Sequence, residues 1–518
     1  MSSDSTTPDP DTAGDAHASR VEKLRRIEAL GIDPWGGRFD GHTSIDHVLT
    51  LPADLPEAER PRVRIAGRVV GRRVKGKMHF LDVWDSSGRP TTRQTKEVAG
   101  KREAGEVSGL TSQVQVMIRP QGVGETGWAL AQELDLGDLI GVDGTFGRTK
   151  MGEPTVFADG LTFLTKALEP PPSNFYGMHD EEYRLRHRYL DLIYNPQTLE
   201  RAKQRVKIVR TMRNYLDERG YMEVETPTLH SIAGGAAARP FVTHHNALDI
   251  DLFLRIALEL HLKRLLVGGI EKVYEIGRVF RNEGISRKHN PEFTMLELYQ
   301  AYGDYRSMMD LTEGLIVACV DAIGGGRVRP WADQTVDFNP PWQRARYCDL
   351  FQEYVGCSMF DPAAVLAAAQ KHQLPTQGKE HEVLVHNLFE HVVEEKLVGP
   401  VFVHDYPAGL CPLTKRQSGN AAVAERFELY VRGMELANAY TELNDPVTQE
   451  ATFRRQLAGL PEDDSMAKMD HDFIRAQRHG MPPAGGLGIG IDRLVMLLTN
   501  TQTIRDVILF PLLRPEAE

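Results

Sequence analysis

Residues 278–302 read Arg-Val-Phe-Arg-Asn-Glu-Gly-Ile-Ser-Arg-Lys-His-Asn-Pro-Glu-Phe-Thr-Met-Leu-Glu-Leu-Tyr-Gln-Ala-Tyr and are unusually rich in polar and charged side chains. Strand-like runs at 273–280 and 293–302 flank a polar segment with the turn-forming Asn282-Glu-Gly284. The pattern predicts a β-hairpin with a charged tip. A guanidinium at the end of such a strand can bind a carboxylate and a phosphate oxygen together. The side chains expected to converge there are Arg281, Glu283, Glu297 and Tyr299, with Arg287, Lys288 and His289 in the loop.

The composition of the chain is that of a folded, water-soluble protein. It has 518 residues, 41% hydrophobic and 26% charged, which is long enough for two or more domains with their own cores. The formal net charge is −11. Residues 62–77 nevertheless contain seven basic side chains and no acidic one, which predicts a local positive face that a polyanion could contact.

Cysteine usage and the N-terminus indicate the compartment. The four cysteines are single and irregularly spaced, which favours neither a zinc site nor a disulfide framework and fits a reducing environment. The first sixteen residues contain no basic start followed by an apolar run, and no later apolar stretch reaches membrane-spanning length. We therefore expect a cytoplasmic location without membrane contact.

The first third of the chain predicts a tail, a helix and a small barrel. Residues 1–16 are expected to form a disordered tail, and residues 17–60 a helical extension with a basic helix at 18–30. Between 61 and 165, apolar and polar residues alternate in short strands separated by glycines, which predicts an oligonucleotide-binding barrel. Such barrels bind bases on one sheet face. The candidates on that face are Arg73, Phe80 and Gln115.

The sequence after the barrel predicts a proline-rich linker at 166–195 and a larger domain at 196–518. The domain begins with an amphipathic helix at 197–219, followed by a strand at 221–227. Residues 482–498 run from a glycine-rich strand into an apolar helix whose N-terminus, with Arg493 in its first turn, favours an anion. A glycine-rich turn before a helix is common, so this segment alone indicates little.

Taken together, these segments resemble the class II aminoacyl-tRNA synthetases, and in detail the lysyl-tRNA synthetases. Phe280-Arg-Asn-Glu-Gly284 with His289-Asn-Pro-Glu-Phe-Thr294 is similar to the second signature motif of the class. The helix and strand at 197–227 are similar to motif 1, and 482–498 to motif 3. The main departure is 90–112, which looks like an insertion between barrel strands, where a disordered surface loop is expected.

The resemblance implies an α+β fold in which a class II antiparallel sheet flanked by helices follows an N-terminal OB-fold barrel that binds the anticodon. It implies activation of L-lysine with ATP to lysyl-adenylate and pyrophosphate, then transfer of lysine to the 3′ end of tRNA(Lys). Mg²⁺ as cofactor and a homodimer formed through motif 1 are also implied. The anticodon-binding residues by this resemblance are Arg68, Arg73, Phe80 and Gln115.

The resemblance also assigns roles in the catalytic domain. Arg281 would bridge the lysine carboxylate and the α-phosphate, and Arg493 would hold the far phosphates, as the two catalytic residues. Glu428 and Glu435 would bind Mg²⁺. Buried acids are needed for lysine because an unpaired cation in a dry pocket is costly. Glu442 with Tyr299 would bind the ε-ammonium and Glu259 with Glu297 the α-ammonium; the other implied residues are Gly235, Asn438 and Tyr440 for lysine, and Glu283, His289, Asn290, Phe293, Glu428, Glu435 and Gly490 for ATP.

Three other functions are compatible with parts of the sequence. An aspartyl or asparaginyl synthetase shares the barrel and catalytic sheet, but its pocket needs a cation for the side chain, whereas Glu442 and Tyr299 suit an ammonium. A lysyl transferase acting on a protein would lack the barrel predicted at 62–165. A catalytically silent RNA-binding paralogue would keep the fold, although the residues implied for ATP and metal are all present in this chain.

Overall fold

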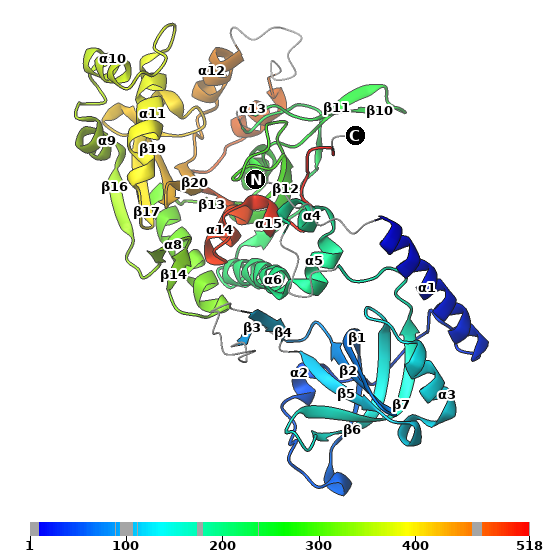
Figure 1. Ribbon diagram of the computed structural model, residues 1–518. Coiled ribbons are helices and arrows are strands. Elements are labelled where there is room, and N and C mark those ends of the chain that lie inside the picture. The colour runs from blue at the N-terminus through cyan, green and yellow to red at the C-terminus, as the bar shows by residue number, and fades with distance from the viewer. Residues whose placement is uncertain are drawn as a thin grey trace. The chain divides into compact units, whose positions relative to one another are not determined.

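The structure is a computed structural model, which describes residues 10–88, 90–93, 107–110, 112–172, 180–236, 238–457 and 469–516. It divides into two compact units, Met1–Glu200 and Arg201–Glu518 (Figure 1). The mixture of helices with antiparallel sheet confirms the predicted α+β class. Within the described ranges, no helix combines the length and apolar character needed to cross a membrane.

The first unit contains a closed five-stranded barrel in the order β1-β2-β5-β7-β6. β5 and β7 pair in parallel, and the other neighbours pair antiparallel. Ile65, Leu81 and Val83 alternate with outward side chains and are fully buried inside the barrel. This is the oligonucleotide-binding architecture predicted from the sequence. The elements are β1 (Arg62–Lys75), β2 (Met78–Trp84), β5 (Gln113–Ile118), α3 (Pro120–Glu133), β6 (Leu139–Arg148) and β7 (Pro154–Thr165).

The segments around the barrel differ in part from the predictions. Helix α1 spans Pro10–Ala29, so residues 10–16 begin a helix rather than belonging to a disordered tail. Proline is favourable in a first helical turn and the alanines that follow have high helix propensity, which the tail prediction underestimated. In the 90–112 insertion, β3 (Pro90–Arg93) pairs antiparallel with β4 (Val107–Leu110), and residues 94–106 lie outside the described residues. The other elements of this unit are α2 (Ile45–Val48), η1 (Glu57–Glu59), α4 (Glu181–Arg186) and α5 (Arg188–Tyr194).

The second unit is built on a nine-stranded sheet with the strand path β16-β17-β19-β20-β21-β13-β12-β8, and β18 paired to β19. Its interior pairs are antiparallel. At the two edges, β16 pairs in parallel with β17, and β8 pairs in parallel with β12. The predicted hairpin is present. Phe280 and Glu292 form its last strand pair before the connecting loop. The strands are β8 (Met222–Glu223), β12 (Lys272–Phe280), β13 (Glu292–Ala301), β16 (Gln343–Arg346), β17 (Val401–Pro407), β18 (Arg416–Gln417), β19 (Asn420–Val431), β20 (Met434–Thr441) and β21 (Ala484–Gly490).

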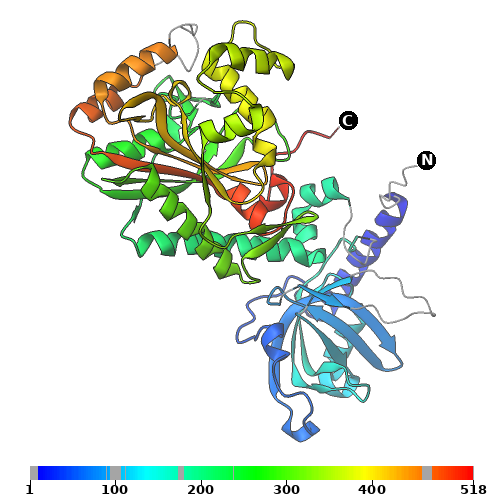
Figure 2. The same ribbon diagram turned by 90° about the vertical axis from the view of Figure 1, so that its left-hand side faces the viewer.

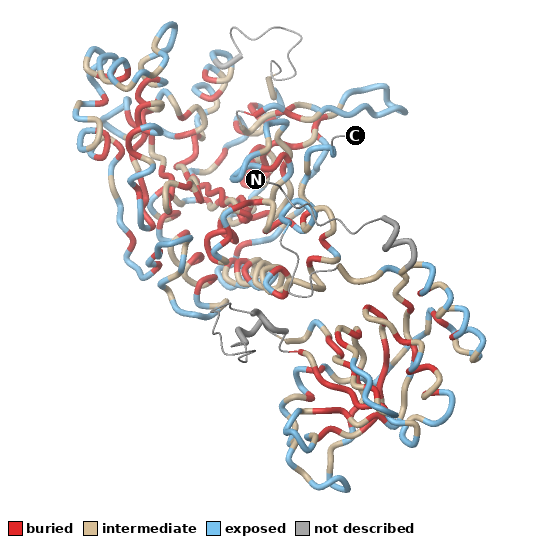
Figure 3. The backbone as a smooth tube through the Cα atoms, viewed as in Figure 1, coloured by how far each residue is buried: buried red, intermediate tan, exposed pale blue. Residues whose placement is uncertain are grey.

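The two faces of this sheet have different roles because successive strand residues point to opposite sides. In β13, Leu296 and Leu298 lie in the main hydrophobic core, whereas Glu297 and Tyr299 face a cavity. Helices α6 (Pro196–Asp217), α8 (Tyr305–Ile323) and α14 (Ile491–Leu498) contribute to the core. Helix α7 (Glu259–Val267) packs in a separate cluster with Tyr299. Figure 2 shows helices on both sides of the sheet, and Figure 3 shows its central strands largely buried.

The remaining elements extend this framework. Helices α9, α10 and α11 connect β16 to β17 and form their own apolar cluster. Helix α13 packs Phe473 against Leu260 of α7. The bounds are β9 (Leu229–His230), β10 (Val242–His245), β11 (Ile250–Leu254), β14 (Val328–Trp331), β15 (Gln334–Asp337), α9 (Tyr347–Val355), α10 (Pro362–Lys371), α11 (His381–Val392), η2 (Glu394–Lys396), η3 (Ala408–Leu410), α12 (Pro446–Leu457), α13 (His471–Arg478) and α15 (Ile504–Val507).

Candidate active site

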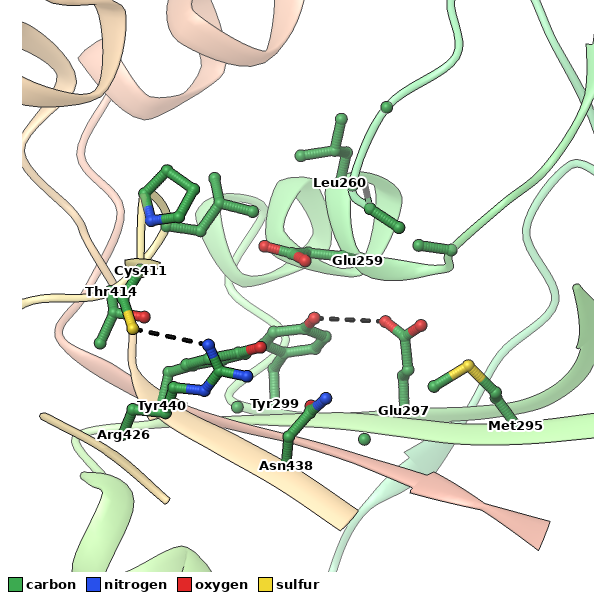
Figure 4. A pocket seen from close by; sticks show the side chains of 18 of the residues that line it. Glu259, Leu260, Met295, Glu297, Tyr299, Cys411, Thr414, Arg426, Asn438 and Tyr440 are labelled. Atoms are coloured by element: carbon green, nitrogen blue, oxygen red, sulfur yellow. Dashed lines mark hydrogen bonds between the residues drawn. The ribbon is translucent and has the colours of Figure 1, made fainter. Parts of the chain in front are cut away.

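A cavity of 560 Å³ lies over the polar face of the sheet. Its floor combines Glu297 and Tyr299 of β13 with Asn438 and Tyr440 of β20, and these side chains point into the same space (Figure 4). The neighbouring strand β21 contributes glycines at the same face, which leaves room above it. The wall is formed by the start of α7, the loop at 233–236 and the segment 410–414.

Three carboxylates gather at one end of this cavity, around Tyr299; we call Glu259, Glu297 and Glu442 the acidic slot. The Tyr299 hydroxyl donates to Oε2 of Glu297 at 3.3 Å, and the backbone N–H of Leu258 donates to Oε1 at 3.1 Å. Burial and the nearby Glu259 raise the pKa of Glu297 to about 7. Burial and the surrounding carboxylates also raise the pKa of Tyr299 well above its ordinary value, so this phenol stays protonated and can donate.

Glu442 is paired inside the protein. Its Oε2 lies 2.5 Å from Nζ of Lys263, which also donates to Oε1 of Glu259 at 2.5 Å. Lys263 is completely buried, and the two carboxylates hold its pKa above the ordinary value despite that burial. Glu442 does not line the cavity itself. A Cβ placed on the cavity-lining Gly486 would lie 1.9 Å from Oε1 of Glu442, so this carboxylate lies directly beside the floor.

A second cavity, of 250 Å³, shares part of its lining with the first. Arg281 and Asn438 contribute to both, so either residue can contact ligands in the two spaces at once. The guanidinium of Arg281 lies 5.2 Å from the ring centre of Phe293, and its Nε donates to the backbone oxygen of Ile256 at 3.4 Å. The second cavity brings together these residues predicted for ATP: Arg281, Glu283, His289, Asn290, Phe293, Glu435, Gly490 and Arg493.

Arg493 is held at the far end of the second cavity. It lies in the first turn of α14, which begins after Gly490, and its Nη1 donates to the backbone oxygen of Glu435 at 2.9 Å. Its Nη2 lies 3.2 Å from Nε2 of His289. Burial and the charge of Arg493 lower the pKa of His289, so the imidazole is neutral at physiological pH. The helix N-terminus and the guanidinium together form a positive surface suited to phosphate groups.

A third cavity, of 470 Å³, is lined by both predicted metal ligands. Glu428 is buried and accepts hydrogen bonds from Tyr406 at 3.0 Å and Tyr430 at 2.5 Å, while Arg426 pairs with its Oε1. The charge of Arg426 and the two phenols hold the pKa of Glu428 below its ordinary value, despite burial. Glu435 is more exposed, and His289 and Arg493 line both this cavity and the second one.

The residues of the third cavity suit a divalent cation. Burial and the nearby Glu390, Glu428 and Glu435 raise the pKa of Glu394 to about 7, which is the crowding of carboxylates that a cation would relieve. Mg²⁺ is commonly bound by one or two carboxylates together with substrate phosphates. In the described part of the chain, no three His, Cys, Asp or Glu side chains form a preformed metal cluster. The arrangement therefore fits a metal held jointly by protein and nucleotide.

Some contributing residues were not predicted. Lys263 stands four residues after Glu259 on α7, a spacing at which helical side chains meet, so this pair was readable from the sequence. Arg426 stands two residues before Glu428, on the same face of β19. Its contacts with Tyr406 and Tyr440, at 4.8 Å and 5.3 Å, depend on strand order and could not be read locally. Gly235 lines the first cavity as predicted, with a φ of +88° that favours glycine.

The strand pairings of the barrel place its four predicted residues on one side of the sheet. Arg73 pairs with Phe80 across β1 and β2, and the adjacent Asp82 pairs with Gln115 across β2 and β5. Because paired residues point to the same side, Arg73, Phe80 and Gln115 share this face. Gln115 is buried there, and its Oε1 accepts a hydrogen bond from Oγ1 of Thr155 at 3.0 Å. Arg68 pairs with Trp84, which lies on the same side of β2 as Phe80 and Asp82, and its Nη1 donates to the backbone oxygen of Gly137 at 2.7 Å.

The basic run at 62–77 is less positive than its sequence indicates. Arg62 pairs with Asp159 at 2.7 Å, Arg64 with Asp143 at 2.9 Å and Arg73 with Asp82 at 3.3 Å. These acids come from β6, β7 and β2, which the prediction of a positive face did not take into account. Part of the local charge is therefore neutralised by neighbouring strands.

Comparisons with known proteins give consistent results along the whole chain. The family model described as "tRNA synthetases class II (D, K and N)" matches residues 180–514. The lysine–tRNA ligase of Moorella thermoacetica is 46% identical over 511 residues, covering 97% of this chain and 99% of the relative. Those of Halalkalibacterium halodurans and Bacillus cereus are 45% and 44% identical over 510 residues, each covering 96% of this chain and 97% and 96% of the relatives.

Proposed function

This chain belongs to the lysine–tRNA ligase family of class II tRNA synthetases, and on that premise we propose that it joins L-lysine to tRNA(Lys) with ATP. The first step makes lysyl-adenylate and pyrophosphate, and the second transfers lysine to the 3′ end of the tRNA. The observation that carries the proposal is the acidic slot beside Arg281, in a cavity that adjoins a second, cation-lined one.

The geometry supports direct attack of lysine on ATP. A carboxylate oxygen of lysine attacks the α-phosphorus, the bond from that phosphorus to the bridging oxygen breaks, and pyrophosphate leaves. Arg281 lines both cavities and binds the lysine carboxylate and the α-phosphate, neutralising charge that builds up between them. Arg493, beside the neutral His289, binds the far phosphates of ATP. No protein nucleophile is needed because the reaction depends on positioning and charge.

Lysine recognition follows from the acidic slot. Glu297 and Glu259 bind the α-ammonium, and Gly235 supplies backbone at the same end of the cavity. The ε-ammonium lies beside Tyr299 and Glu442, and Asn438 contacts the carboxylate. Tyr440 packs along the aliphatic stem. Aspartate or asparagine would place an acidic or neutral side chain among these carboxylates, which disfavours both.

Mg²⁺ is the proposed cofactor, held by Glu428 and Glu435 with the phosphates of ATP. When bound, it would offset phosphate charge. Glu428 is held in place by Tyr406 and Tyr430, and Glu435 by the hydrogen bonds to Arg493 and Asn438. Glu283, Asn290, Phe293 and Gly490 complete the ATP site, with Phe293 under the adenine.

We further propose a homodimer and anticodon recognition by the barrel. Val206 of α6 and Met222 of β8 are exposed apolar residues in the segment that resembles motif 1, and the exposed Leu229 follows it; a second copy would cover them. On the barrel, Arg73 and Phe80 present the basic and aromatic groups that bind unpaired bases. Gln115 is buried beside them, and its amide would reach a base only by releasing Thr155. The proposed domains are a helical extension up to residue 60, the barrel at 61–165, a linker at 166–195 and the catalytic domain at 196–518. A cytoplasmic location completes the proposal.

Pyrophosphate exchange tests the function directly. Purified protein is incubated with ATP, Mg²⁺, labelled pyrophosphate and one amino acid at a time. Label should enter ATP with lysine only. Exchange with aspartate or asparagine would overturn the substrate, and a complete absence of exchange would favour a silent RNA-binding protein. Charging of tRNA(Lys) with labelled lysine then separates a tRNA ligase from a transferase that acts on proteins.

A further inference from the structure

Lys263 is a buried ammonium that the chemistry above does not use. It connects two parts of the acidic slot from distant parts of the sequence, with Nζ 2.5 Å from Oε1 of Glu259 and 2.5 Å from Oε2 of Glu442. Its side chain has no exposed surface. A charge without solvent is retained only where its partners compensate the lost hydration, and here two carboxylates do so.

Lys263 sets the charge of the slot. At pH 8, above the pKa of about 7 to which burial raises both Glu297 and Glu442, three carboxylates and one ammonium leave two negative charges, which equals the number of ammonium groups that free lysine carries. Without Lys263, three carboxylates would face one another in a dry pocket, and like charges at such proximity do not all ionise. One of them would hold a proton and could no longer bind an ammonium with full charge.

Lys263 also leaves one side of Glu442 open. Both carboxylate oxygens of Glu442 are buried without a hydrogen bond among the residues that the structure describes; Oε2 is compensated by its ion pair with Lys263, whereas Oε1 has no such partner. It lies beside Gly486 and Tyr299, both of which line the 560 Å³ cavity: a Cβ on Gly486 would lie 1.9 Å from it and 2.6 Å from the Tyr299 ring. A buried acceptor without a donor is rare in proteins and marks a place for a ligand group.

We propose that Lys263 is a positioning residue for diamino acid substrates, which fixes Glu259 and Glu442 and directs Oε1 of Glu442 to the ε-ammonium of the substrate. The inference rests on the proposed function of this site. Lys263 does not line the cavity, yet it would determine specificity for a substrate with two ammonium groups. A substrate with a neutral side chain leaves one negative charge of the slot unpaired.

Every element packed around Lys263 contributes to its charge environment. β13 contributes Glu297 of the slot and the neighbouring Tyr299, and β20 contributes Tyr440 to the same cavity. On the other side of α7, Arg264 is paired with Asp470 and Asp472, so these acids are already neutralised. The groups that titrate or carry charge here are Glu259, His261, Lys263, Arg264, Arg281, Glu297, Tyr299, Tyr440, Glu442, Asp470 and Asp472.

The first test replaces the ammonium with an uncharged chain of similar length, Lys263→Met. Lysine-dependent exchange should show a lysine KM raised roughly 30-fold or more, as for loss of one partner of a buried charge pair. The ATP KM and kcat should change by less than about threefold, as expected for sites outside the slot. Lys272→Met is the matched control, because Lys272 lies on adjacent β12 and its Nζ donates to the backbone oxygen of Arg219 outside the slot. A merely structural Lys263 would lower kcat and thermal stability while leaving the lysine KM unchanged, and that result would overturn the proposal.

The second test uses the unaltered protein and so does not depend on the folding of a variant. Lysine binding is measured by calorimetry at pH 8 in two buffers of different ionisation enthalpy. If Lys263 keeps the slot ionised, binding releases well under about half a proton. Release of about one proton would show that a carboxylate was neutral before binding, which contradicts the proposal. Absence of both lysine binding and exchange in the unaltered protein would instead overturn the proposed function.

Discussion

The acidic slot and the outer face of the barrel use charge in opposite ways. In the slot, Glu442 and Lys263 are almost completely removed from water, so each charge depends on its partner. On the barrel face, the Arg73 side chain is 64% exposed, so its pairing with Asp82 is screened and weak. In the proposed function, the slot would therefore select one small ligand by a few buried ion pairs, whereas the barrel would bind a large one by many weak contacts.

The largest loss of activity is expected at Gly486, which lies beside Glu442 of the acidic slot. Gly486→Ala would place Cβ 1.9 Å from Oε1 of Glu442 and 2.6 Å from the Tyr299 ring, so one of these groups must move. Displacing a buried charge costs about 2–5 kcal/mol, which predicts a loss of roughly 30-fold to several thousandfold in kcat/KM for lysine in pyrophosphate exchange.

Gly488→Ala is the matched control on the same strand and face. Its Cβ would meet Asn438 at 3.3 Å, a contact that a small side-chain shift relieves, so its loss should stay below about tenfold. Equal losses in the two variants would show that the strand, rather than the Glu442 position, is sensitive. Folding is checked by thermal unfolding in both.

On the barrel, removal of one ring should have a smaller effect confined to tRNA. Phe80→Ala removes a stacking surface worth roughly 1–3 kcal/mol per base, so kcat/KM for tRNA(Lys) charging should fall about 5-fold to 150-fold. Lysine-dependent pyrophosphate exchange without tRNA should be unchanged. A parallel fall in exchange would mean that Phe80 supports folding instead. The two assays on one preparation separate these outcomes.

The pKa of Glu297, raised to about 7 by burial and Glu259, predicts a pH effect specific to the slot. In the proposed site the ionised form binds the α-ammonium, so lysine affinity should fall at least about tenfold for each pH unit below 7, with Glu442 adding to the slope in the same range. The same shift affects folding with the opposite sign. The folded state binds more protons than the unfolded state between pH 4.5 and 7, so the free energy of unfolding should decrease as pH rises through this range.

Glu297→Gln should reduce the pH dependence of both lysine affinity and the free energy of unfolding. Without a titrating group at 297, the decrease in the free energy of unfolding between pH 4.5 and 7, up to about 1.4 kcal/mol per pH unit, should become smaller. The measurements are lysine titrations and urea unfolding across the range. An unchanged unfolding profile in the variant would assign the slope to other groups, such as Glu394 or Glu442.

The sequence predicted the parts of the site that lie within single motifs. The β12–β13 hairpin has its own turn signals and alternating pattern, so the placement of Arg281, Glu297 and Tyr299 followed from local rules. The barrel followed in the same way from period-two strands and glycines. Its strand order, with β5 parallel to β7, depends on long-range pairing and was not predicted from the sequence.

Pairings between distant segments were not predictable from spacing. Lys263 and Glu442 meet because α7 packs over β13 while β20 lies two strands away across β21. The sequence therefore assigned Glu442 to a ligand ammonium without its internal partner. In the barrel, Asp143 and Asp159 neutralise Arg64 and Arg62 across strand pairs, which a count of basic residues along 62–77 does not reveal.

The smallest effect should distinguish two arginines of the same barrel strand. Arg73 lies beside Phe80 on the outer face, whereas Nη1 of Arg68 already donates to Gly137. Arg73→Ala should weaken tRNA(Lys) binding a few-fold and reduce the slope of log affinity against log salt by about 1, because one phosphate contact is lost. Arg68→Ala should leave that slope unchanged, and any loss should appear as lower thermal stability, because a hydrogen bond between strand and loop is removed. A reduced slope for Arg68→Ala would extend the tRNA surface along β1 to Arg68 and contradict the assignment of the phosphate contact to Arg73 alone.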